Sequence, residues 1–151
     1  MGDLSTVERL AAWSAWVPLS EAVAAAPLLP GVYMAREGVG SAVVYVGMAG
    51  ERRGRGIRGR LTVYSRGKAV VSGLGEAAMD RALADPEWLR ARLADVEAGQ
   101  PERAAAWGRL ALKRANLHLR WATVPDRAGA LALESAVLAE LSSAVLWNRR
   151  R

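Results

Sequence analysis

Three stretches of the chain show the pattern of β-strands. Residues 31–36 and 42–47 are short runs of apolar and β-branched side chains, and the segment 36–41 between them is polar and rich in glycine. Two strands joined by a loop are typical of this order. Residues 117–124 alternate between apolar and polar side chains. A half-buried strand has this period of two, so we predict a third strand there.

Apolar positions with a helical period predict the remaining elements. We expect helices at 6–16, 20–26, 57–66 and 126–142, and several more between 75 and 115. Ser20 and Asp126 are the expected N-caps of the second and the last of the four. The helical stretch 75–115 contains Asp85-Pro86 and Gly99-Gln100-Pro101. We expect the helix to break at both places.

Together these elements predict an α+β fold in a single domain over residues 1–151. The predicted sheet has three antiparallel strands, a hairpin plus the later strand, and it is flanked by helices. Residues 1–29 form a helical lead-in. Residues 70–116 form a helical insertion between the first core helix and the third strand, and the simplest role for this insertion is cover over the sheet.

Composition excludes several kinds of site. The chain has no cysteine, so disulfides, thiol nucleophiles and cysteine-bound metals are excluded. His118 is its one histidine, and a zinc site needs more nitrogen or sulfur ligands than that. No run reaches the roughly 18 apolar residues of a membrane span. We therefore expect a cytoplasmic protein without a membrane partner.

Positive charge is concentrated in one segment. The chain carries a net charge of +6. Residues 51–68 hold seven basic side chains and one acidic side chain, which is also a net +6. The basic residues are Arg52, Arg53, Arg55, Arg58, Arg60, Arg66 and Lys68. Such a cluster is typical of a surface that binds a polyanion, and the alternative is a solvated basic surface.

The same segment spells the pattern G-x-G-x-x-G from Gly54 to Gly59. A dinucleotide-binding loop would follow its strand tightly within a βαβ unit. Here the preceding strand ends at Gly47, well before Gly54, and it belongs to a predicted hairpin. We therefore reject dinucleotide binding and expect these glycines to let an arginine-rich loop approach a phosphate backbone.

Three side chains are candidates for chemistry. Tyr33 and Tyr45 lie on the paired strands, so their hydroxyl groups can converge on one face of the sheet. Glu134 falls near the middle of the apolar arc of the last helix, which includes Leu131 and Val137. An ionised carboxylate that faces a core is costly unless it is paired or bound to a metal. Pairing with an arginine, or a position at the core edge, is the alternative for this residue.

The candidate residues belong to a longer ordered series. Gly31-Val32-Tyr33 is followed by Tyr45-Val46-Gly47, then by Arg60 with Tyr64 one helical turn later, by Leu131 to Glu134, and by Trp147-Asn148. The series resembles the GIY-YIG nuclease family, with GVY and YVG as its two half-motifs. The resemblance covers roughly residues 30–68 and 117–148, and it does not explain the helical segments at 1–29 and 70–116.

The resemblance implies a metal-dependent endonuclease that hydrolyses phosphodiester bonds in DNA, with RNA not excluded as a substrate. In this scheme Glu134 binds one Mg²⁺ or Mn²⁺ ion, which polarises the scissile phosphate, and Arg60 stabilises the charge of the transition state. Tyr33, alone or with Tyr45, activates water, and a nearby cation or metal would lower its pKa for this role. Which tyrosine acts as the base stays open.

The other residues of the series have supporting roles in this scheme. Tyr64 and Asn148 support the site. The contacts with the nucleic-acid backbone are expected from Arg52, Arg53, Arg55, Arg58, Arg66 and Lys68. Two other functions stay open. One is a nucleic-acid-binding module of the same fold that does not cut, and the other is a protein-interaction domain that uses the insertion 70–116.

Overall fold

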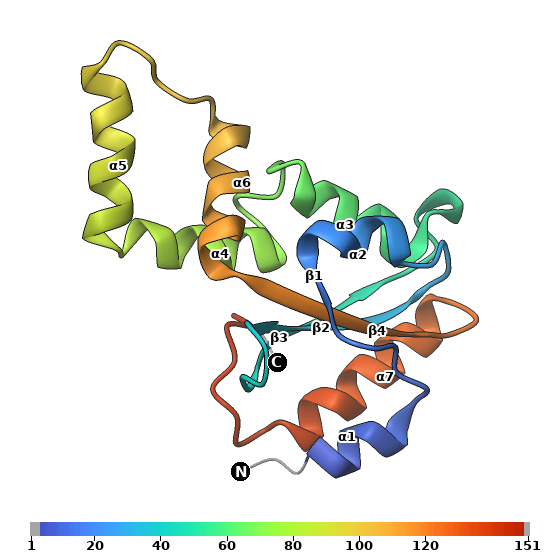
Figure 1. Cartoon of the computed structure of the whole chain (residues 1–151). Coiled ribbons are helices and arrows are strands. Elements are labelled where there is room, and N and C mark those ends of the chain that lie inside the picture. The colour runs from blue at the N-terminus through green and yellow to red at the C-terminus, as the bar shows by residue number, and fades with distance from the viewer. Residues whose placement is uncertain (1–3, 150–151) are drawn as a thin grey trace.

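The computed structural model describes residues 4–149, and these form one four-stranded antiparallel sheet with helices on both faces (Figure 1). The strands are β1 (Val17–Pro18), β2 (Gly31–Glu37), β3 (Val43–Ala49) and β4 (Leu117–Thr123), in the order β1-β4-β2-β3. The α+β class is confirmed, but the prediction of three strands was wrong by one. β1 was missed because two residues, one of them proline, carry no periodicity.

Helices cover both faces of the sheet, so its central strand is buried on both sides. α2 (Leu19–Ala25) and α3 (Gly56–Ser65) cover one face, and α7 (Arg127–Glu140) covers the other together with α1 (Leu4–Leu10) (Figure 1). β2 pairs with β4 on one side and with β3 on the other. Its first five residues, from Gly31 to Ala35, are all buried. β2 therefore supplies core side chains to both layers.

The β2–β3 hairpin sets the positions of two motif tyrosines. In its register Tyr33 lies opposite Gly47, and Ala35 lies opposite Tyr45. Positions two apart on paired strands face the same side of a sheet. Both tyrosines belong to the core cluster that also contains Ile57 of α3, so they point toward the α2–α3 layer.

The insertion forms a helical arm beside the sheet. It consists of α4 (Gly73–Leu83), α5 (Pro86–Glu97) and α6 (Ala104–Ala115). The two breaks lie where the sequence predicted them, and Asp85 caps α5 by accepting hydrogen bonds from the N–H groups of Glu87 and Trp88. α5 stands away from the rest of the molecule (Figure 1) and buries none of its residues. Trp88 and Trp107, with ring centroids 5.4 Å apart, link α5 to α6.

The N-terminal helices differ from the prediction at their ends. α1 ends at Leu10 rather than near residue 16, and beyond it the indole N–H of Trp13 donates to the Val7 carbonyl at 2.9 Å. Pro18, not Ser20, precedes the first turn of α2, because the fixed φ of proline suits the start of a helix. Among the described residues, no helix has the length and apolar character that crossing a membrane requires.

Candidate active site

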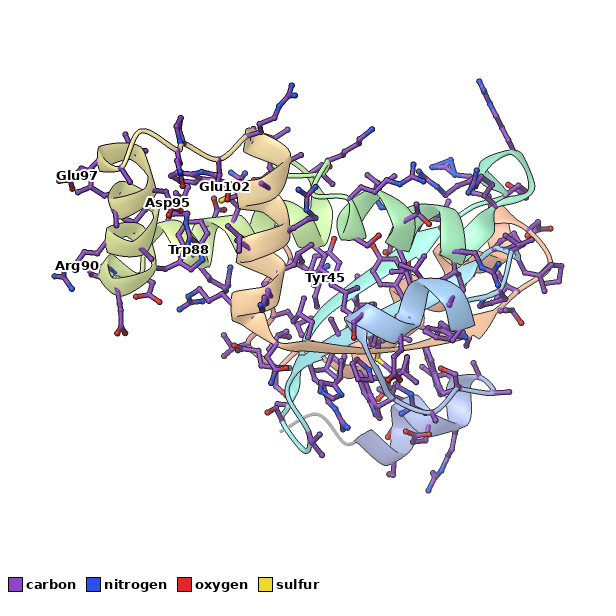
Figure 2. The ribbon with its side chains drawn as sticks, turned by 45° about the horizontal axis from the view of Figure 1, so that its top comes forward. Tyr45, Trp88, Arg90, Asp95, Glu97 and Glu102 are labelled. Atoms are coloured by element: carbon purple, nitrogen blue, oxygen red, sulfur yellow. The ribbon has the colours of Figure 1, made fainter. Side chains whose placement is uncertain are left out.

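Five of the six predicted catalytic residues line one cavity of about 750 Å³. They are Tyr33, Tyr45, Arg60, Glu134 and Asn148. Its walls come from β2, β3, α3, α4, α7 and the segment that follows α7, and Tyr45 is labelled in Figure 2. The sixth residue, Tyr64, is fully buried behind this wall. The fold thus gathers residues from distant parts of the chain around one space.

The three tyrosines of the chain form one cluster. The rings of Tyr33 and Tyr45 are stacked with centroids 6.3 Å apart, and Tyr64 meets Tyr33 edge-on at 6.2 Å. The hydroxyl groups of Tyr33 and Tyr64 share a hydrogen bond of 2.9 Å. The backbone N–H of Leu74, in the first turn of α4, donates to the Tyr64 oxygen at 3.2 Å. The helical arm is therefore joined directly to the tyrosine cluster.

Two glycines make room for this cluster. A Cβ added to Gly47 would lie 2.3 Å from the hydroxyl oxygen of Tyr33, so the YVG half-motif ends in glycine because the Tyr33 side chain crosses it. A Cβ on Gly73 would lie 2.3 Å from the Tyr64 hydroxyl and 2.8 Å from the Arg60 guanidinium. Gly73 also has a φ of +55°, a conformation that disfavours other residues. Neither position has space for a side chain.

Arg60 brings a positive charge to the cavity. Its guanidinium carbon lies 4.9 Å from the centroid of the Tyr64 ring, and its side chain is half-buried. Within residues 4–149 Arg60 forms no ion pair. Because a guanidinium stays protonated at any working pH, the charge of Arg60 is available to an anion that enters the cavity.

The tyrosines resist ionisation in this environment. Burial raises the pKa of Tyr33 well above its ordinary value, and Tyr64 and Tyr45 raise it further, while Arg60 acts in the opposite direction. Burial is also the main cause that raises the pKa of Tyr45. Arg60 lowers both pKa values, as expected of a neighbouring cation, but desolvation outweighs it and the net shift is upward. Both phenols are neutral in this state of the molecule.

Glu134 is a half-buried carboxylate without a protein partner. It forms no hydrogen bond and no ion pair with any other described residue. Burial raises the pKa of Glu134 above its usual value. The side chain lines the polar cavity rather than the apolar core. The predicted apolar arc was wrong at its N-terminal end, since Leu131 is 43% exposed.

The oxygen atoms of Glu134 suit one hard cation. Mg²⁺ and Mn²⁺ prefer oxygen ligands, and Mg²⁺ usually keeps several of its waters. Glu134 offers two unpartnered carboxylate oxygens beside a cavity of about 750 Å³, which has room for a hydrated ion. No group of three or more His, Asp or Glu side chains within residues 4–149 could hold a metal. An ion bound at Glu134 would therefore take most of its remaining ligands from water.

Asn148 holds the segment after α7 against β3. Its side-chain amide donates to the Val46 carbonyl at 2.7 Å and accepts from the Val46 N–H at 3.1 Å. The amide thus imitates a strand partner for β3, which is an edge strand of the sheet. Val46 follows Tyr45 directly, so this contact fixes the rim of the cavity next to that tyrosine.

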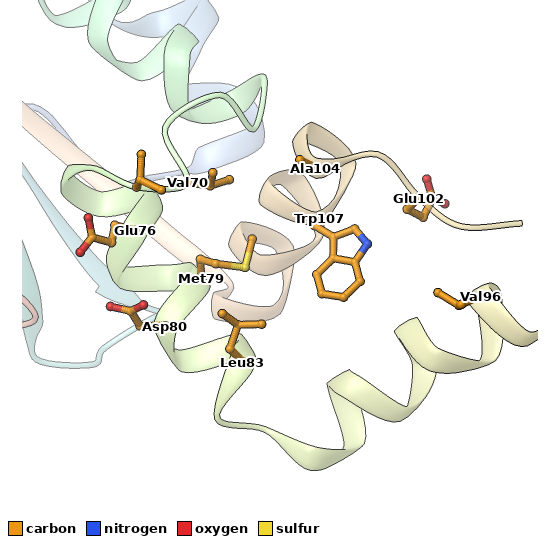
Figure 3. Close-up of a pocket in the computed structure, with 10 residues that line it drawn as sticks. Val70, Glu76, Met79, Asp80, Leu83, Val96, Glu102, Ala104 and Trp107 are labelled. Carbon is orange, nitrogen blue, oxygen red and sulfur yellow. The ribbon is translucent and has the colours of Figure 1, made fainter.

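α4 adds charged residues that the sequence did not mark as part of the site. Glu76, Asp80 and Arg81 line the same cavity as Glu134, and Glu76 forms an ion pair with Arg149. Figure 3 shows both carboxylates on one side of α4, at the rim of a second, apolar cavity of about 660 Å³ between the arm helices. The available signal in the sequence was the spacing of four between Glu76 and Asp80, which places them on one helix face.

The predicted backbone-binding residues divide between two environments. A surface hollow of about 380 Å³ is lined by Arg52, Arg53, Arg55 and Arg66, and Lys68 is also exposed. Arg58 instead donates to the carbonyl of Ala26 at 2.7 Å and to that of Ala24 at 3.3 Å. These carbonyls lie at the C-terminal end of α2, so Arg58 caps that helix and is less available to a phosphate than the exposed arginines.

No family model, curated protein or solved structure matches this chain. The relation to GIY-YIG nucleases is therefore a resemblance between short stretches of sequence. The motif residues lie around one cavity, in the geometry given above, and the function is inferred from the chemistry of that cavity.

Proposed function

We propose that this chain is a metal-dependent endonuclease that hydrolyses phosphodiester bonds in DNA. The observation that carries the proposal is the presence of two charged groups without ion-pair partners, Glu134 and Arg60, in one polar cavity. Partly buried charges without an ion-pair partner are costly, and functional sites retain such charges for a ligand. A phosphodiester group together with a divalent cation complements both of them.

In this proposal Arg60 binds the phosphate, and Asn148 holds the edge of the cavity. Arg60 can bind non-bridging phosphate oxygens through its planar fork and stabilise the charge that develops as the phosphorus becomes five-coordinate. A divalent cation at Glu134 would supply Lewis-acid polarisation of the scissile phosphate. Asn148 keeps the edge of the cavity in place through its two hydrogen bonds with Val46.

In this proposal Tyr33 orients the attacking water. Its hydroxyl shares a hydrogen bond with Tyr64, whose oxygen also accepts from the N–H of Leu74. When Tyr33 donates to Tyr64, the Tyr33 oxygen keeps its lone pairs for a water molecule in the cavity. A neutral phenol can align water in this way. Action as a general base requires the pKa of Tyr33 to fall when substrate binds.

A nucleic-acid-binding module that does not cut is the second candidate. The observation in its favour is the raised pKa of both Tyr33 and Tyr45, which makes them poor bases in the unliganded chain. A feature that speaks against it is Glu134, since an ionised carboxylate repels a phosphate unless a cation lies between them. On a surface that only binds nucleic acid, that repulsion would weaken binding.

The experiment that tests the proposal is a cleavage panel. The purified chain is incubated with single-stranded, duplex, flapped and branched DNA and with RNA, in Mg²⁺, in Mn²⁺ and in EDTA. We expect at least one DNA to be cut in the presence of metal and none in EDTA. Binding of these DNAs without cleavage under any metal condition would favour the second candidate. Cleavage that persists in EDTA would contradict the metal-dependent mechanism.

A further inference from the structure

Basic side chains continue from α3 onto α6. Arg109 and Lys113 are exposed and lie one turn apart on α6. The Arg109 guanidinium donates to the backbone carbonyl of Arg66 at 3.3 Å, so the two helices meet where α3 ends. Arg109 and Lys113 also line one hollow together with Ser65. The insertion thus extends the basic surface that begins in the segment 51–68.

A close approach of two glycines puts these helices together. A Cβ added to Gly108 of α6 would lie 2.6 Å from the carbonyl oxygen of Gly67, and a Cβ on Gly67 would lie 1.9 Å from the carbonyl oxygen of Ala105. Gly67, one residue beyond Arg66, has a φ of +70°. The contact leaves no room for a side chain at Gly67 or Gly108. This close packing of α6 against the end of α3 keeps Arg66 and Arg109 near each other.

We define the basic stripe as the seven exposed basic residues along this surface. They are Arg52, Arg53, Arg55, Arg66, Lys68, Arg109 and Lys113. None of the seven is in an ion pair with another described residue. α6 contains no acidic residue, and Glu51 is the one acidic residue in 51–68. The stripe therefore presents charge that the protein itself does not neutralise.

The basic stripe and the tyrosine cavity lie on different sides of α3. At about 100° per residue, Arg55 and Arg66 lie within ~20° of each other around the helix axis. On the same count Arg60 and Tyr64 lie roughly 140–180° away from Arg55. The burial agrees, because Tyr64 is buried while Arg55 and Arg66 are exposed. The hollow lined by the arginines shares no residue with the cavity.

We infer that the basic stripe binds a second segment of nucleic-acid backbone, separate from the one that enters the tyrosine cavity. The substrate of this inference is a branched or flapped DNA with two arms. The identity of the polymer rests on the proposed function. α3, with side chains about 10–12 Å across, stands between the two surfaces. A straight duplex is stiff over roughly 150 base pairs, so it can lie against one side of α3 but not against both. Two arms that diverge at a junction can engage both surfaces together.

The test compares binding of branched and straight DNA of equal total length in Ca²⁺, a cation that carboxylate oxygens such as those of Glu134 can bind, and the DNA is checked to be uncut after each measurement. The variant is Arg109→Gln with Lys113→Gln, and the matched control is Arg90→Gln with Arg103→Gln, which removes the same charge from exposed positions outside the stripe. We expect the natural chain to prefer branched DNA by about tenfold or more, since two linked contacts add their avidity. We expect the variant to lose that preference and the control to keep it.

Each outcome decides a different point. A natural chain that binds straight and branched DNA equally, or a variant that retains the full preference, overturns the two-arm inference while the endonuclease proposal stands on its cleavage panel. A variant that loses affinity for both DNAs by the same factor also overturns it, because the stripe would then serve a single binding mode. A natural chain that binds neither DNA removes the proposed function itself.

Discussion

At the scale of single residues, the atoms that lie close to Gly31 and Gly47 explain why the two half-motifs contain glycine there. Gly31 faces the neighbouring strand, where a Cβ would lie 2.1 Å from the carbonyl oxygen of Ala122. Gly47 lies under the Tyr33 side chain, where a Cβ would lie 2.3 Å from the hydroxyl oxygen. Gly31 thus permits the close approach of β4, and Gly47 leaves room for the Tyr33 side chain.

The substitution Gly47→Ala should therefore destabilise the protein. Overlap with the Tyr33 side chain forces it out of position, and overpacking of this kind costs about 1–3 kcal/mol. The measurement is the free energy of unfolding in urea. The matched control is Gly50→Ala, whose added Cβ would have its nearest contacts with the side chain of Arg127, at 3.3 Å. Equal stability of both variants would contradict the close contact between Gly47 and Tyr33.

The tyrosine cluster predicts an unusual response to alkaline pH. Since the pKa values of Tyr33 and Tyr45 are raised in the folded chain, tyrosine absorbance should change above the ordinary value of about 10, whereas the unfolded chain should titrate near that value. The folded state retains protons that the unfolded state has lost, so stability should fall as pH rises beyond about 10. Ionisation of Tyr33 and Tyr45 near the ordinary pKa in the folded chain would contradict their burial in the cluster.

At the scale of elements, α3 separates three tasks by the direction of its side chains. Arg58 reaches the end of α2, Arg60 faces the cavity, and the exposed Arg55 and Arg66 belong to the basic stripe. Residues two apart on a helix do not share a face. The helix and its two cap residues, Arg55 and Arg66, therefore connect the α2 layer, the site and the outer surface.

Arg58→Ala should act on stability rather than on DNA binding alone. Its guanidinium satisfies carbonyls at the end of α2, and loss of hydrogen bonds from a charged donor costs about 1–3 kcal/mol. The measurement is urea unfolding of Arg58→Ala beside Arg55→Ala, which removes an arginine that makes no such contact. An Arg58→Ala variant as stable as Arg55→Ala would contradict the capping role.

The sequence predicted the long elements of this fold for local reasons. The hairpin, β4, α3 and α7 each carry their own period, and breaks in the arm are marked by proline. Sites assembled by packing were harder to predict. Glu76 and Asp80 enter the cavity because α4 lies against β3 and the cavity, and Arg58 caps α2 because α2 packs on α3. No pattern within one segment reports such contacts between segments.

At the scale of the whole molecule, acidic side chains gather on residues 73–102 of the arm, and exposed basic side chains gather on the basic stripe. Seven of the fifteen acidic residues of the chain lie between positions 73 and 102. They are Glu76, Asp80, Asp85, Glu87, Asp95, Glu97 and Glu102, of which the last three are labelled in Figure 2. A field of this form steers a polyanion away from α4 and α5 and toward the outer side of α3 and α6.

Nucleic-acid binding should consequently weaken steeply with salt. On duplex DNA each neutralised phosphate contributes about −0.9 to the slope of log K against log salt. Replacement of Arg52, Arg53 and Arg55 by glutamine should flatten the slope by about two to three such increments. The measurement is fluorescence anisotropy over a salt series, with Arg90→Gln and Arg103→Gln as the control. An unchanged slope in the triple variant would mean that these arginines form only a solvated surface.

The central claim, that Glu134 and Arg60 make this cavity a metal-dependent nuclease site, is tested most directly by single-turnover nicking in Mg²⁺. Glu134→Gln should abolish nicking, and Arg60→Ala should slow it by on the order of 10²–10³, while melting curves show that both variants are folded. Glu140→Gln, on the same helix but outside the cavity, should cut at the natural rate. Nicking by Glu134→Gln at the rate of the natural chain would contradict the account.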